Sequence, residues 1–580
     1  MTFMSLKKDA VAAPFVQVEE DENGVLKNIS FTNDENFNFA YDVVDKLAKK
    51  CPDKTAMIHI SKEGKERAFT FYEMSRYSSK VANYLQYLGI RKGDHVMLVL
   101  KRHYQFWFAI LALHKIGAVV IPATNLLLKS DFEYRFKTGK VDAILCTADG
   151  PVSREVDKAT RSYRNLKVKI MVGASRKGWH SFNKEVKYFS SHFKRPRGEQ
   201  AIHGDDPSIM FFTSGTTSYP KITTHNFKYP LGHYVTAKYW HQVDPEGIHF
   251  AISDTGWGKA LWGKIYGQWL CEAAVFTYDF DDFDAKEILR MIERYRITTF
   301  CAPPTVYRVM VHLKLDQYDL SSLQNVTTAG EALNPEIYEK FRAKTGLTLM
   351  EGFGQTETTL IIGNLTGDKP RPGSMGKPTP QYDVRVMLQD GTLAAPEEEG
   401  EIVIRTSQGI PDGLFMEYYG DEEKTNAAWY DGYYHTGDTA YYDEDGYLWY
   451  VGRTDDVIKS SGYRIGPFEI ENEIMKLPYV LECAVTAVPD PIRGQAIKAS
   501  IVLTNGEEAS DKLKSEIMKS LKKNIASYKW PKILDFTKEL PKTISGKIRR
   551  KEIRDMDEGS EGKEENGKEN EVENDIESNE

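Results

Sequence analysis

The stretch FFTSGTTSYPKITTH, from Phe211 to His225, joins an apolar run to a loop of hydroxyl side chains, a glycine, Pro220 and Lys221. Ser, Thr and Gly are common in ordinary turns because they tolerate tight backbone conformations. The same residues also wrap phosphate groups, since backbone N–H groups, hydroxyls and a lysine all attract anions. The spacing is not that of a Walker A loop, in which the lysine directly follows a glycine. The stretch alone leaves two interpretations open, a surface turn and a phosphate loop.

Helix-like and strand-like segments alternate along most of the chain. Apolar periodicity predicts helices over residues 40–50, 71–89 and 284–296 and again after Pro304, with strands over 55–60, 94–100 and 297–302. The apolar run that begins at Phe106 predicts a buried helix that turns into a strand, because His114, Lys115 and Gly117 interrupt it too often for a membrane span. This alternation of helices and strands predicts an α/β fold, with parallel-rich sheets covered by helices on both faces.

The pattern changes after about Gly376. Short predicted strands over 382–388, 400–406 and 447–452 indicate a small β-rich subdomain, and the segments from 468 to 525 indicate a separate small α+β domain that is mobile. A chain of 580 residues needs more than one domain. We expect a leader over 1–37, a large domain over 38–454, a small domain over 455–555 that begins at a hinge at Asp455, and a disordered tail over 556–580.

Composition narrows the class of protein. The tail carries eleven acidic residues and two lysines, a net charge of −9, so the rest of the chain is close to neutral and indicates no nucleic-acid surface. The five cysteines have no C-x-x-C spacing, which argues against zinc sites and disulfides. No signal or transit segment is evident at the N-terminus. We therefore expect a cytoplasmic protein without a membrane span, whose oligomeric state is unknown.

Three further motifs carry chemistry. MEGFGQTETT, Met350 to Thr359, places polar groups after a predicted strand, where α/β sheets bind ligands. The region from Tyr434 to Glu471 contains Asp438, Arg453 and Arg464, a carboxylate and two guanidinium groups suited to ribose hydroxyls or phosphates. PKTISGKIRRKEI presents Lys547 in a basic turn near the end of the chain. Each motif alone is equally compatible with a solvated turn.

Together and in this order, the four motifs resemble those of the acyl- and acetyl-CoA synthetases of the adenylate-forming superfamily, which also contains luciferases and peptide adenylation domains. The resemblance covers roughly residues 38 to 554. The stretches GRTDDVIKSSGYRIGPFEIE and SDTGW, Ser253 to Trp257, are most similar to the medium-chain or branched acyl-CoA synthetase branch.

The resemblance implies an ATP site. It assigns Lys547, Thr356 and Glu357 to catalysis, with Glu357 holding the Mg²⁺ that accompanies ATP. The residues that it assigns to ATP or AMP binding are Thr213, Ser214, Gly215, Thr216, Thr217, Lys221, Gly330, Glu331, Ala332, Glu351, Gly352, Phe353, Gln355, Thr356, Asp438, Arg453 and Arg464. Of these, the resemblance implies that Gly330 to Ala332, Glu351 and Phe353 frame the adenine.

It also implies where the acid and the thiol bind. Trp257, Lys259 and Gly354 would line the acyl pocket, and Gly354 stands where acetate-specific relatives carry a tryptophan, so a longer or branched chain should fit. The positions implied for the co-substrate CoA are Ser461, Gly462, Arg493 and Tyr528.

These residues predict an AMP-forming acyl-CoA synthetase that acts through an acyl adenylate. Its predicted partners are small molecules, namely ATP, a carboxylic acid and CoA. Two alternatives stay open: an adenylating ligase that loads a separate carrier protein, and a non-catalytic sensor of acyl nucleotides.

Overall fold

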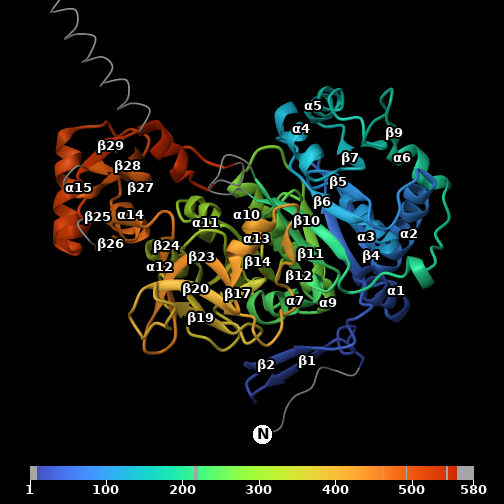
Figure 1. Ribbon diagram of the computed structural model, residues 1–580, viewed down its shortest axis with the longest axis horizontal. Helices are drawn as coiled ribbons and strands as arrows, with labels where there is room; N and C mark the ends of the chain where they lie inside the picture. The colour runs from blue at the N-terminus through green and yellow to red at the C-terminus, as the bar shows by residue number, and fades with distance from the viewer. Residues whose placement is uncertain (1–8, 214–219, 461–462, 491–492, 544–546, 558–580) are drawn as a thin grey trace, which may run out of the picture. The chain divides into compact units, whose positions relative to one another are not determined.

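The computed structural model describes residues 9–213, 220–460, 463–490, 493–543 and 547–557. The chain divides into two compact units (Figure 1). The large unit comprises Met1–Leu333, Ile337–Val384 and Ile404–Tyr434, and the small unit comprises Asn334–Glu336, Arg385–Val403 and His435–Glu580. In the predicted leader, the strands β1 (Val16–Glu20) and β2 (Leu26–Phe31) form an antiparallel hairpin. Of the predicted acidic tail, only Met556 and Asp557 are among the described residues.

The first sheet of the large unit has parallel strands at its centre. Its order among the described residues is β21-β11-β10-β6-β5-β7-β8-β9, for β21 (Glu417–Tyr418), β11 (Lys221–Asn226), β10 (Pro207–Thr213), β6 (Val119–Pro122), β5 (His95–Val99), β7 (Ala143–Thr147), β8 (Val168–Val172) and β9 (His180–Ser181). Strands from β10 to β9 pair in parallel, whereas β11 pairs antiparallel with both β10 and β21.

Apolar side chains project from both faces of this sheet. Along β5, Val96 and Leu98 join the core beneath α2 (Phe71–Tyr87) and α3 (Gln105–Ile116). Met97 and Val99 join the opposite core, with α4 (Lys129–Thr138) and α5 (Val152–Ala159). Strands buried on both faces read as continuous apolar runs, and this explains why the segment over 94–100 shows no alternation.

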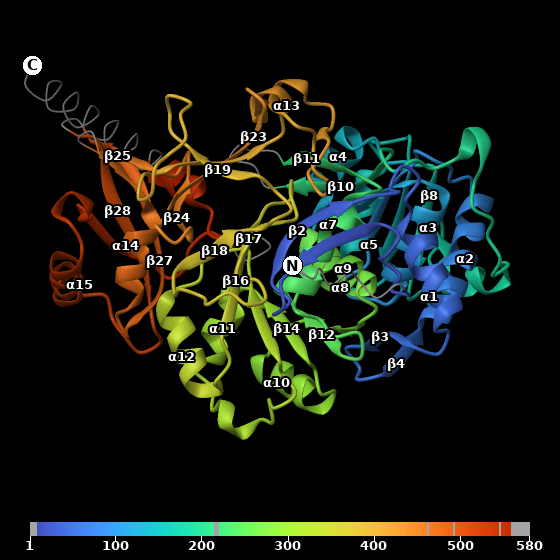
Figure 2. The ribbon, with the colours of Figure 1, turned by 90° about the horizontal axis from the view of Figure 1, so that it is seen from below.

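The second sheet of the large unit runs in the order β18-β17-β16-β15-β14-β12-β13-β3-β4. Its strands are β18 (Ser374–Pro378), β17 (Leu360–Gly363), β16 (Leu349–Gly354), β15 (Asn325–Thr328), β14 (Thr299–Ala302), β12 (Ile248–Ala251), β13 (Ala274–Tyr278), β3 (Thr55–Ile60) and β4 (Glu66–Thr70). The strands from β16 to β3 are parallel. The helices α10 (Ala285–Arg294) and α11 (Pro304–Met310) share a core with one face of this sheet (Figure 2). On the other face the core includes α8 (Gly258–Lys264) and α9 (Tyr266–Leu270).

The apolar run from Phe106 forms α3 and then β6, as predicted, and every residue of α3 is buried. Among the described residues, no helix combines the length and the apolar character that crossing a bilayer requires. The Lys115 ammonium is fully buried, 2.8 Å from Asp45 Oδ1 and 2.9 Å from Ser79 Oγ. Burial lowers the pKa of Lys115, and the Asp45 carboxylate opposes that shift.

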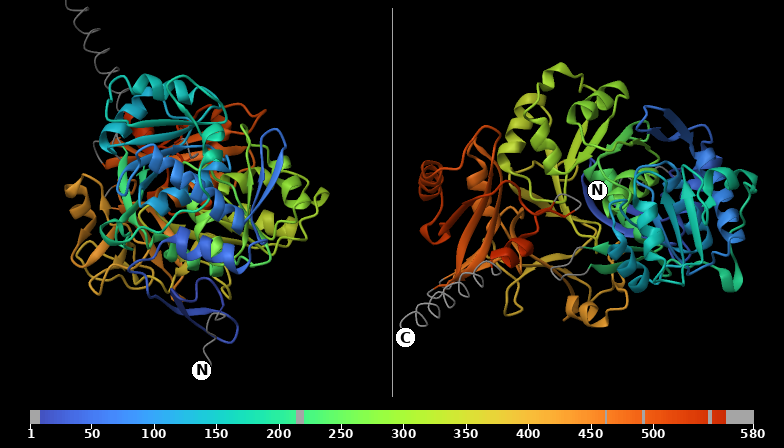
Figure 3. Two further views of the ribbon diagram at one scale, coloured as in Figure 1. Left: turned by 90° about the vertical axis from the view of Figure 1, so that its right-hand side faces the viewer. Right: turned by 90° about the horizontal axis from the view of Figure 1, so that it is seen from above.

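The small unit combines a β-rich part with an α+β part. The β-rich part contains β24 (Leu448–Arg453) and most of β19 (Val384–Met387), β20 (Gly400–Arg405) and β23 (Tyr433–Tyr442), whose remaining one or two residues belong to the large unit. The α+β part is the sheet β27-β28-β29, formed by Val480–Asp490, Gly494–Leu503 and Ile533–Phe536, with α14 (Pro467–Met475) and α15 (Asp511–Asn524) in one shared core (Figures 2 and 3). The predicted elements are confirmed in both parts. The proposed boundary at Asp455 falls within this compact unit and stays a prediction.

The buried pair of Lys115 and Asp45 provides a test of the fold. We expect Asp45→Ala to destabilise the large unit by about 3–5 kcal/mol, because it leaves a buried ammonium without its carboxylate. The measurement is the midpoint of urea unfolding. Asp53→Ala, an exposed acidic residue nearby in the chain, is the control. Equal midpoints for the two variants would show that the pair contributes no stability.

Candidate active site

The predicted phosphate loop joins two paired strands at one end of the first sheet. β10 ends at Thr213 and β11 begins at Lys221, and these two residues are directly opposite each other in the antiparallel register (Figure 1). Ser214, Gly215, Thr216 and Thr217 lie outside the described residues. The buried Thr213 Oγ1 has no hydrogen-bond partner among the described residues. The hairpin therefore brings a hydroxyl and an ammonium to the two ends of the predicted loop.

Lys221 and Glu357, which are far apart in the sequence, meet through Tyr418. Lys221 Nζ donates to the Tyr418 hydroxyl at 3.1 Å and lies 4.1 Å from the centre of its ring. The Tyr418 hydroxyl donates to Glu357 Oε1 at 2.9 Å. Because β21 pairs with β11, the backbone itself holds Tyr418 beside the phosphate hairpin. The structure thus brings together a predicted phosphate-binding cation and the predicted metal ligand.

The segment after β16 is fixed by side chains from elsewhere in the large unit. The Tyr434 hydroxyl donates to Gln355 Oε1 at 2.7 Å, and His225 Nε2 donates to the Thr356 carbonyl at 2.7 Å. Burial lowers the pKa of His225 to about 4, so the imidazole is neutral at physiological pH. These two hydrogen bonds therefore fix the conformation of the segment after β16, which contains Gln355, Thr356 and Glu357.

The residues expected around adenine lie at the ends of two adjacent parallel strands. Gly330, Glu331 and Ala332 follow β15, and Glu351, Gly352 and Phe353 belong to β16, with Thr328 paired to Glu351. Glu351 Oε1 accepts from the Leu333 N–H at 3.0 Å. Burial raises the pKa of the Glu351 carboxyl to about 8, so much of it is protonated at neutral pH. A protonated carboxyl donates as well as accepts hydrogen bonds.

The surroundings of Lys259 and Gly354, two of the three predicted acyl-pocket residues, restrict what each can do. Lys259 Nζ donates to the Ala329 carbonyl at 3.1 Å, directly before the predicted adenine segment, and lies 5.5 Å from the centre of the Trp262 ring. Trp257 precedes α8. A Cβ atom on Gly354 would lie 2.3 Å from the Thr359 carbonyl oxygen, so the bulged backbone here requires glycine whatever its effect on the acyl chain. Substitution of Gly354 would therefore disturb the backbone as well as the pocket.

In the small unit, Asp438 and Arg453 are directly opposite each other on β23 and β24. Arg453 Nη1 lies 3.4 Å from Asp438 Oδ2, and the Tyr450 hydroxyl donates to Asp438 Oδ1 at 3.0 Å. The side chain of Asp438 is only 6% exposed. The structure brings these two predicted ribose-binding residues together, and the register explains why residues fifteen positions apart meet.

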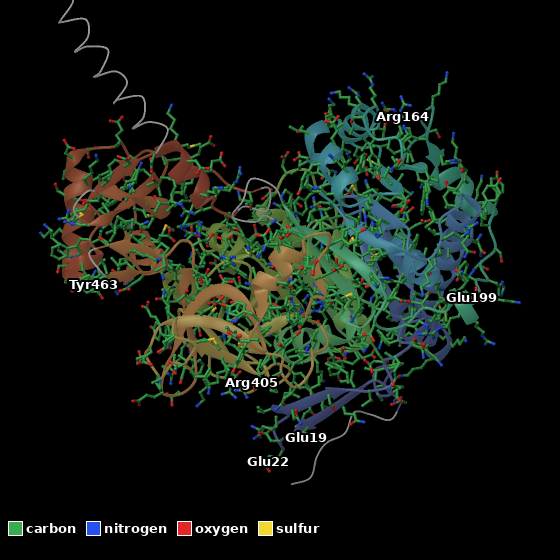
Figure 4. The ribbon with its side chains drawn as sticks, in the orientation of Figure 1. Glu19, Glu22, Arg164, Glu199, Arg405 and Tyr463 are labelled. Atoms are coloured by element: carbon green, nitrogen blue, oxygen red, sulfur yellow. The ribbon has the colours of Figure 1, made fainter. Side chains whose placement is uncertain are left out.

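The predicted CoA residues also belong to the small unit. Tyr528 stacks on Tyr463 with ring centres 4.3 Å apart, and both rings are exposed; Figure 4 labels Tyr463. Arg493 Nη1 lies 3.3 Å from Asp490 Oδ2. Ser461 and Gly462 lie outside the described residues, as does the side chain of Arg464.

Lys547 is exposed, and its backbone is hydrogen-bonded to Thr543. Its N–H donates to Thr543 Oγ1 at 3.1 Å, and the Thr543 N–H donates to the Lys547 carbonyl at 2.7 Å. Asp455 Oδ1 lies 3.5 Å from Arg453 Nε, at the end of β24. The predicted hinge residue is thus an immediate neighbour of the predicted ribose-binding arginine.

The predicted large-unit groups combine cationic and hydroxyl donors with one carboxylate, that of Glu357. Glu357 is largely buried, and its oxygens suit Mg²⁺, a hard ion that proteins usually bind through one or two carboxylates together with substrate phosphates. Lys221 and the hydroxyl of Thr213 suit the phosphates themselves. The donor set therefore fits a nucleotide with its magnesium ion.

This fold defines a class: an α/β protein of two units, in which the predicted phosphate-binding residues Thr213 and Lys221 stand at the ends of two paired antiparallel strands. The family model for AMP-binding enzymes matches residues 44–419, and the model for the AMP-binding enzyme C-terminal domain matches residues 469–547. The chain belongs to the AMP-binding enzyme family.

Relatives with assigned activities cover nearly the whole chain. Acyl-coenzyme A synthetase ACSM3, mitochondrial, from Pongo abelii is 41% identical over 90% of this chain and 89% of its own length, and the Homo sapiens protein of that name is 40% identical over the same shares. Among solved structures, the anthranilate CoA ligase AuaEII in complex with anthranoyl-AMP has a TM-score of 0.83 and 27% identity, covering 91% of this chain and 98% of that one. The Brucella canis acyl-CoA synthetase has a TM-score of 0.67 and 29% identity, covering 90% and 95%.

Sequence reasoning missed four side chains that hold the predicted ones: His225, Tyr418, Tyr434 and Tyr450. His225 even lies within the opening stretch, but a buried histidine has no local sequence pattern that distinguishes it. The tyrosines follow or precede other aromatic residues, so nothing in the local sequence indicates which ring faces the site. The antiparallel pairing of β11 with β21 would have identified Tyr418.

Tyr418→Phe tests the link between Lys221 and Glu357. Losing a hydrogen bond to a charged group costs about 1.5–3 kcal/mol, so we expect kcat/KM for ATP to fall by about 10–100-fold. The ring and its packing remain, and the melting temperature should change little. Tyr419→Phe is the matched control, since no hydrogen bond of its hydroxyl links the two site residues. An unchanged kcat/KM for the Tyr418 variant would remove the tyrosine from the site.

Proposed function

We propose that this enzyme is an AMP-forming acyl-CoA synthetase that converts ATP, a carboxylic acid and CoA into acyl-CoA, AMP and pyrophosphate. The observation that carries the proposal is the Lys221–Tyr418–Glu357 chain, which joins a phosphate-binding cation to a magnesium-binding carboxylate inside an AMP-binding fold. An acid–thiol ligase of this family uses ATP with Mg²⁺ and takes CoA as its co-substrate. The relatives named acyl-coenzyme A synthetase support the same activity.

The first step activates the acid. A carboxylate oxygen attacks the α-phosphorus of ATP, the bond to the bridging oxygen of the β-phosphate breaks, and pyrophosphate leaves. Two anions approach each other and charge builds at phosphorus, so oriented cations and N–H donors are the main catalytic resource. Lys221 and the loop between Thr213 and Lys221 would hold the β- and γ-phosphates, and bound Mg²⁺ would neutralise phosphate charge. Thr356 would orient the α-phosphate, and Lys547 would bridge the carboxylate and the α-phosphate.

The second step transfers the acyl group. The CoA sulfur attacks the carbonyl carbon of the acyl adenylate, and AMP leaves with the bonding electron pair. Asp438 and Arg453 would hold the ribose of AMP. Tyr528 and Arg493, with Ser461 and Gly462, would bind CoA. A rotation at Asp455 would remove Lys547 between the two steps, which is a hinge motion of a kind that many enzymes use.

The acid that we propose is medium-chain or short and branched. Gly354 adds no bulk beyond the backbone, which favours an acid larger than acetate. Lys259 Nζ, beside the Ala329 carbonyl, adds a positive charge near the proposed acyl site. The proposed acceptor is CoA, and a carrier protein in its place is an outcome that product analysis would reveal.

The proposed location is the cytoplasm. The mammalian relatives carry the word mitochondrial in their names, so the compartment is a separate question from the activity. Fractionation of cells that express the tagged full-length chain answers it, because mitochondrial and cytosolic markers separate cleanly.

The activity itself is tested with a panel of acids from acetate to decanoate, including branched and aromatic ones. We expect AMP and pyrophosphate to form with butyrate-sized or larger acids, and mass spectrometry to identify an acyl-CoA thioester. Acetate should be a poor substrate because it leaves apolar pocket surface uncovered, and each missing methylene costs about 1–3 kcal/mol of transition-state binding. Nucleotide binding without AMP production would instead indicate a sensor. A thioester formed only on an added carrier protein would indicate an adenylating ligase that loads a carrier protein.

Lys547→Ala separates the two steps. Removing one oriented stabilising donor typically lowers the rate by about 10²–10³-fold, and we expect that loss in adenylation. Thioester formation from a supplied acyl adenylate should be retained, because Lys547 acts only in the first step. The control is Lys551→Ala, which removes an exposed lysine four residues away. Equal loss in both steps would contradict the proposed role of Lys547.

A further inference from the structure

Arg550, three residues beyond Lys547, makes the best-formed ion pair of this part of the small unit. Its Nη2 lies 2.7 Å from Glu471 Oε2 and 2.8 Å from Oε1, and its Nε lies 3.2 Å from Oε1. The side chain of Glu471 is 9% exposed and that of Arg550 is 22% exposed. The same guanidinium places Nη1 3.9 Å from Asp456 Oδ2. A planar guanidinium gripping a carboxylate with two nitrogens fixes orientation as well as distance.

The partners of Arg550 are themselves anchored. Glu471 lies on α14, and its Oε1 also accepts from the Val485 N–H of β27 at 2.7 Å. Asp456 directly follows the predicted hinge residue, and its Oδ1 accepts from Arg554 Nη1 at 2.7 Å. The Glu471–Arg550–Asp456 cluster therefore joins the helix α14, the sheet, the start of the predicted small domain and the segment that follows Lys547.

Lys547 is exposed, and its backbone makes two hydrogen bonds with Thr543. On either side, Lys542 pairs with Ile548, and the Arg549 N–H donates to the Pro541 carbonyl at 2.8 Å. Ile548 packs on a small core that includes Ile553 and Leu540. The backbone thus holds Lys547 locally, and the fork of Arg550 on Glu471 adds a charged contact with two nitrogens that ties the segment after Lys547 to α14.

We propose that Arg550, held by Glu471 and Asp456, is a positioning residue that makes Lys547 and Asp456, the residue after the proposed hinge, move as one rigid body. During a rotation at Asp455, the Lys547 ammonium would then keep its position relative to Asp456. The proposal rests on the proposed roles of Lys547 and Asp455. It adds that adenylation depends on a side chain that touches neither ATP nor the acid.

If the Arg550–Glu471 ion pair only stabilises the fold, its loss should affect the two half-reactions equally. Breaking a buried pair destabilises a domain, but a destabilised domain loses both half-reactions together. A positioning role predicts a loss confined to the step that uses Lys547, because a misplacement of about 1 Å costs about 10²-fold in rate. The ratio of the two half-reactions is therefore the quantity that separates the two explanations.

The experiment compares Arg550→Met with Arg549→Met in the full-length chain. Arg549 is the matched control, because its side chain is 53% exposed and, within the described part of the chain, forms its ion pair with Glu552 three residues on. Adenylation is followed by ATP–pyrophosphate exchange, and the thioester step by acyl-CoA formation from supplied acyl adenylate. We expect Arg550→Met to lower adenylation kcat by about 10²-fold, with the KM for ATP and the thioester step retained. Arg550→Lys should recover only part of the rate, since an ammonium cannot form the fork.

Arg550→Met leaves the Glu471 carboxylate buried without its partner, which destabilises the fold. The double variant Glu471→Gln/Arg550→Met removes both charges, so the same assays can be made on a folded protein. Its folding is checked by the melting temperature. Equal loss in both half-reactions, or full activity in the folded double variant, would overturn the proposal. Lys547→Ala is measured in the same assays. If Lys547→Ala also shows no loss confined to adenylation, the proposed role of Lys547 is wrong. If Lys547→Ala shows that loss and Arg550→Met does not, the proposed role of Arg550 is wrong.

Discussion

The antiparallel pairing of β11 with strands on both of its sides is the constraint on which the proposed phosphate site depends. On one side, β10 brings Thr213 opposite Lys221, and antiparallel partners place side chains within about 5 Å of each other. On the other side, β21 brings Tyr418 opposite Thr223, two residues after Lys221, and its hydroxyl accepts a hydrogen bond from Lys221 Nζ. A hydroxyl, an ammonium and a phenol are thus held near the ends of the two strands that the predicted phosphate loop joins.

Burial also determines the charge of two groups beside predicted site residues. His225, which donates to the Thr356 carbonyl, is neutral because its pKa falls to about 4, and Glu351 is largely protonated because its pKa rises to about 8. Lys221 and Glu357 are linked to each other through Tyr418. Electrostatic preorganisation of this kind is the largest contribution to many enzymatic rates.

The proposed site residues are divided between the two units. Lys221, Thr356 and Glu357 belong to the large unit, whereas Asp438 and Lys547 belong to the small one. Within the small unit, the proposed hinge at Asp455 separates Asp438 from Lys547. An enzyme that must bring anions together in one step and admit a thiol in the next gains from a catalytic lysine that is carried on a part that can rotate. Such a rotation demands rigidity of the part after Asp455, which is the role that the Glu471–Arg550–Asp456 cluster would serve.

Much of the fold was predictable because its elements follow local periodicity. The continuous apolar run at 94–100 and the amphipathic pattern at 284–296 correspond to β5 and α10. The resemblance of four motifs to one family indicated the nucleotide chemistry and most site residues. The link from Lys221 through Tyr418 to Glu357 was not predictable from either source, since 136 positions separate Lys221 from Glu357 and Tyr418 lies in a third segment.

The sequence by itself determined the type of each element, the order of the motifs and the class of reaction that they serve, because these depend on local pattern and on the chemical nature of side chains. Only the tertiary structure decided which groups meet: Tyr418 with Lys221, Tyr450 with Asp438, and Arg550 with Glu471. It also showed that Gly354 is required by the nearby Thr359 backbone. The physical reason is that strand register and burial are set by the packing of segments distant in the chain, and no local pattern encodes that packing.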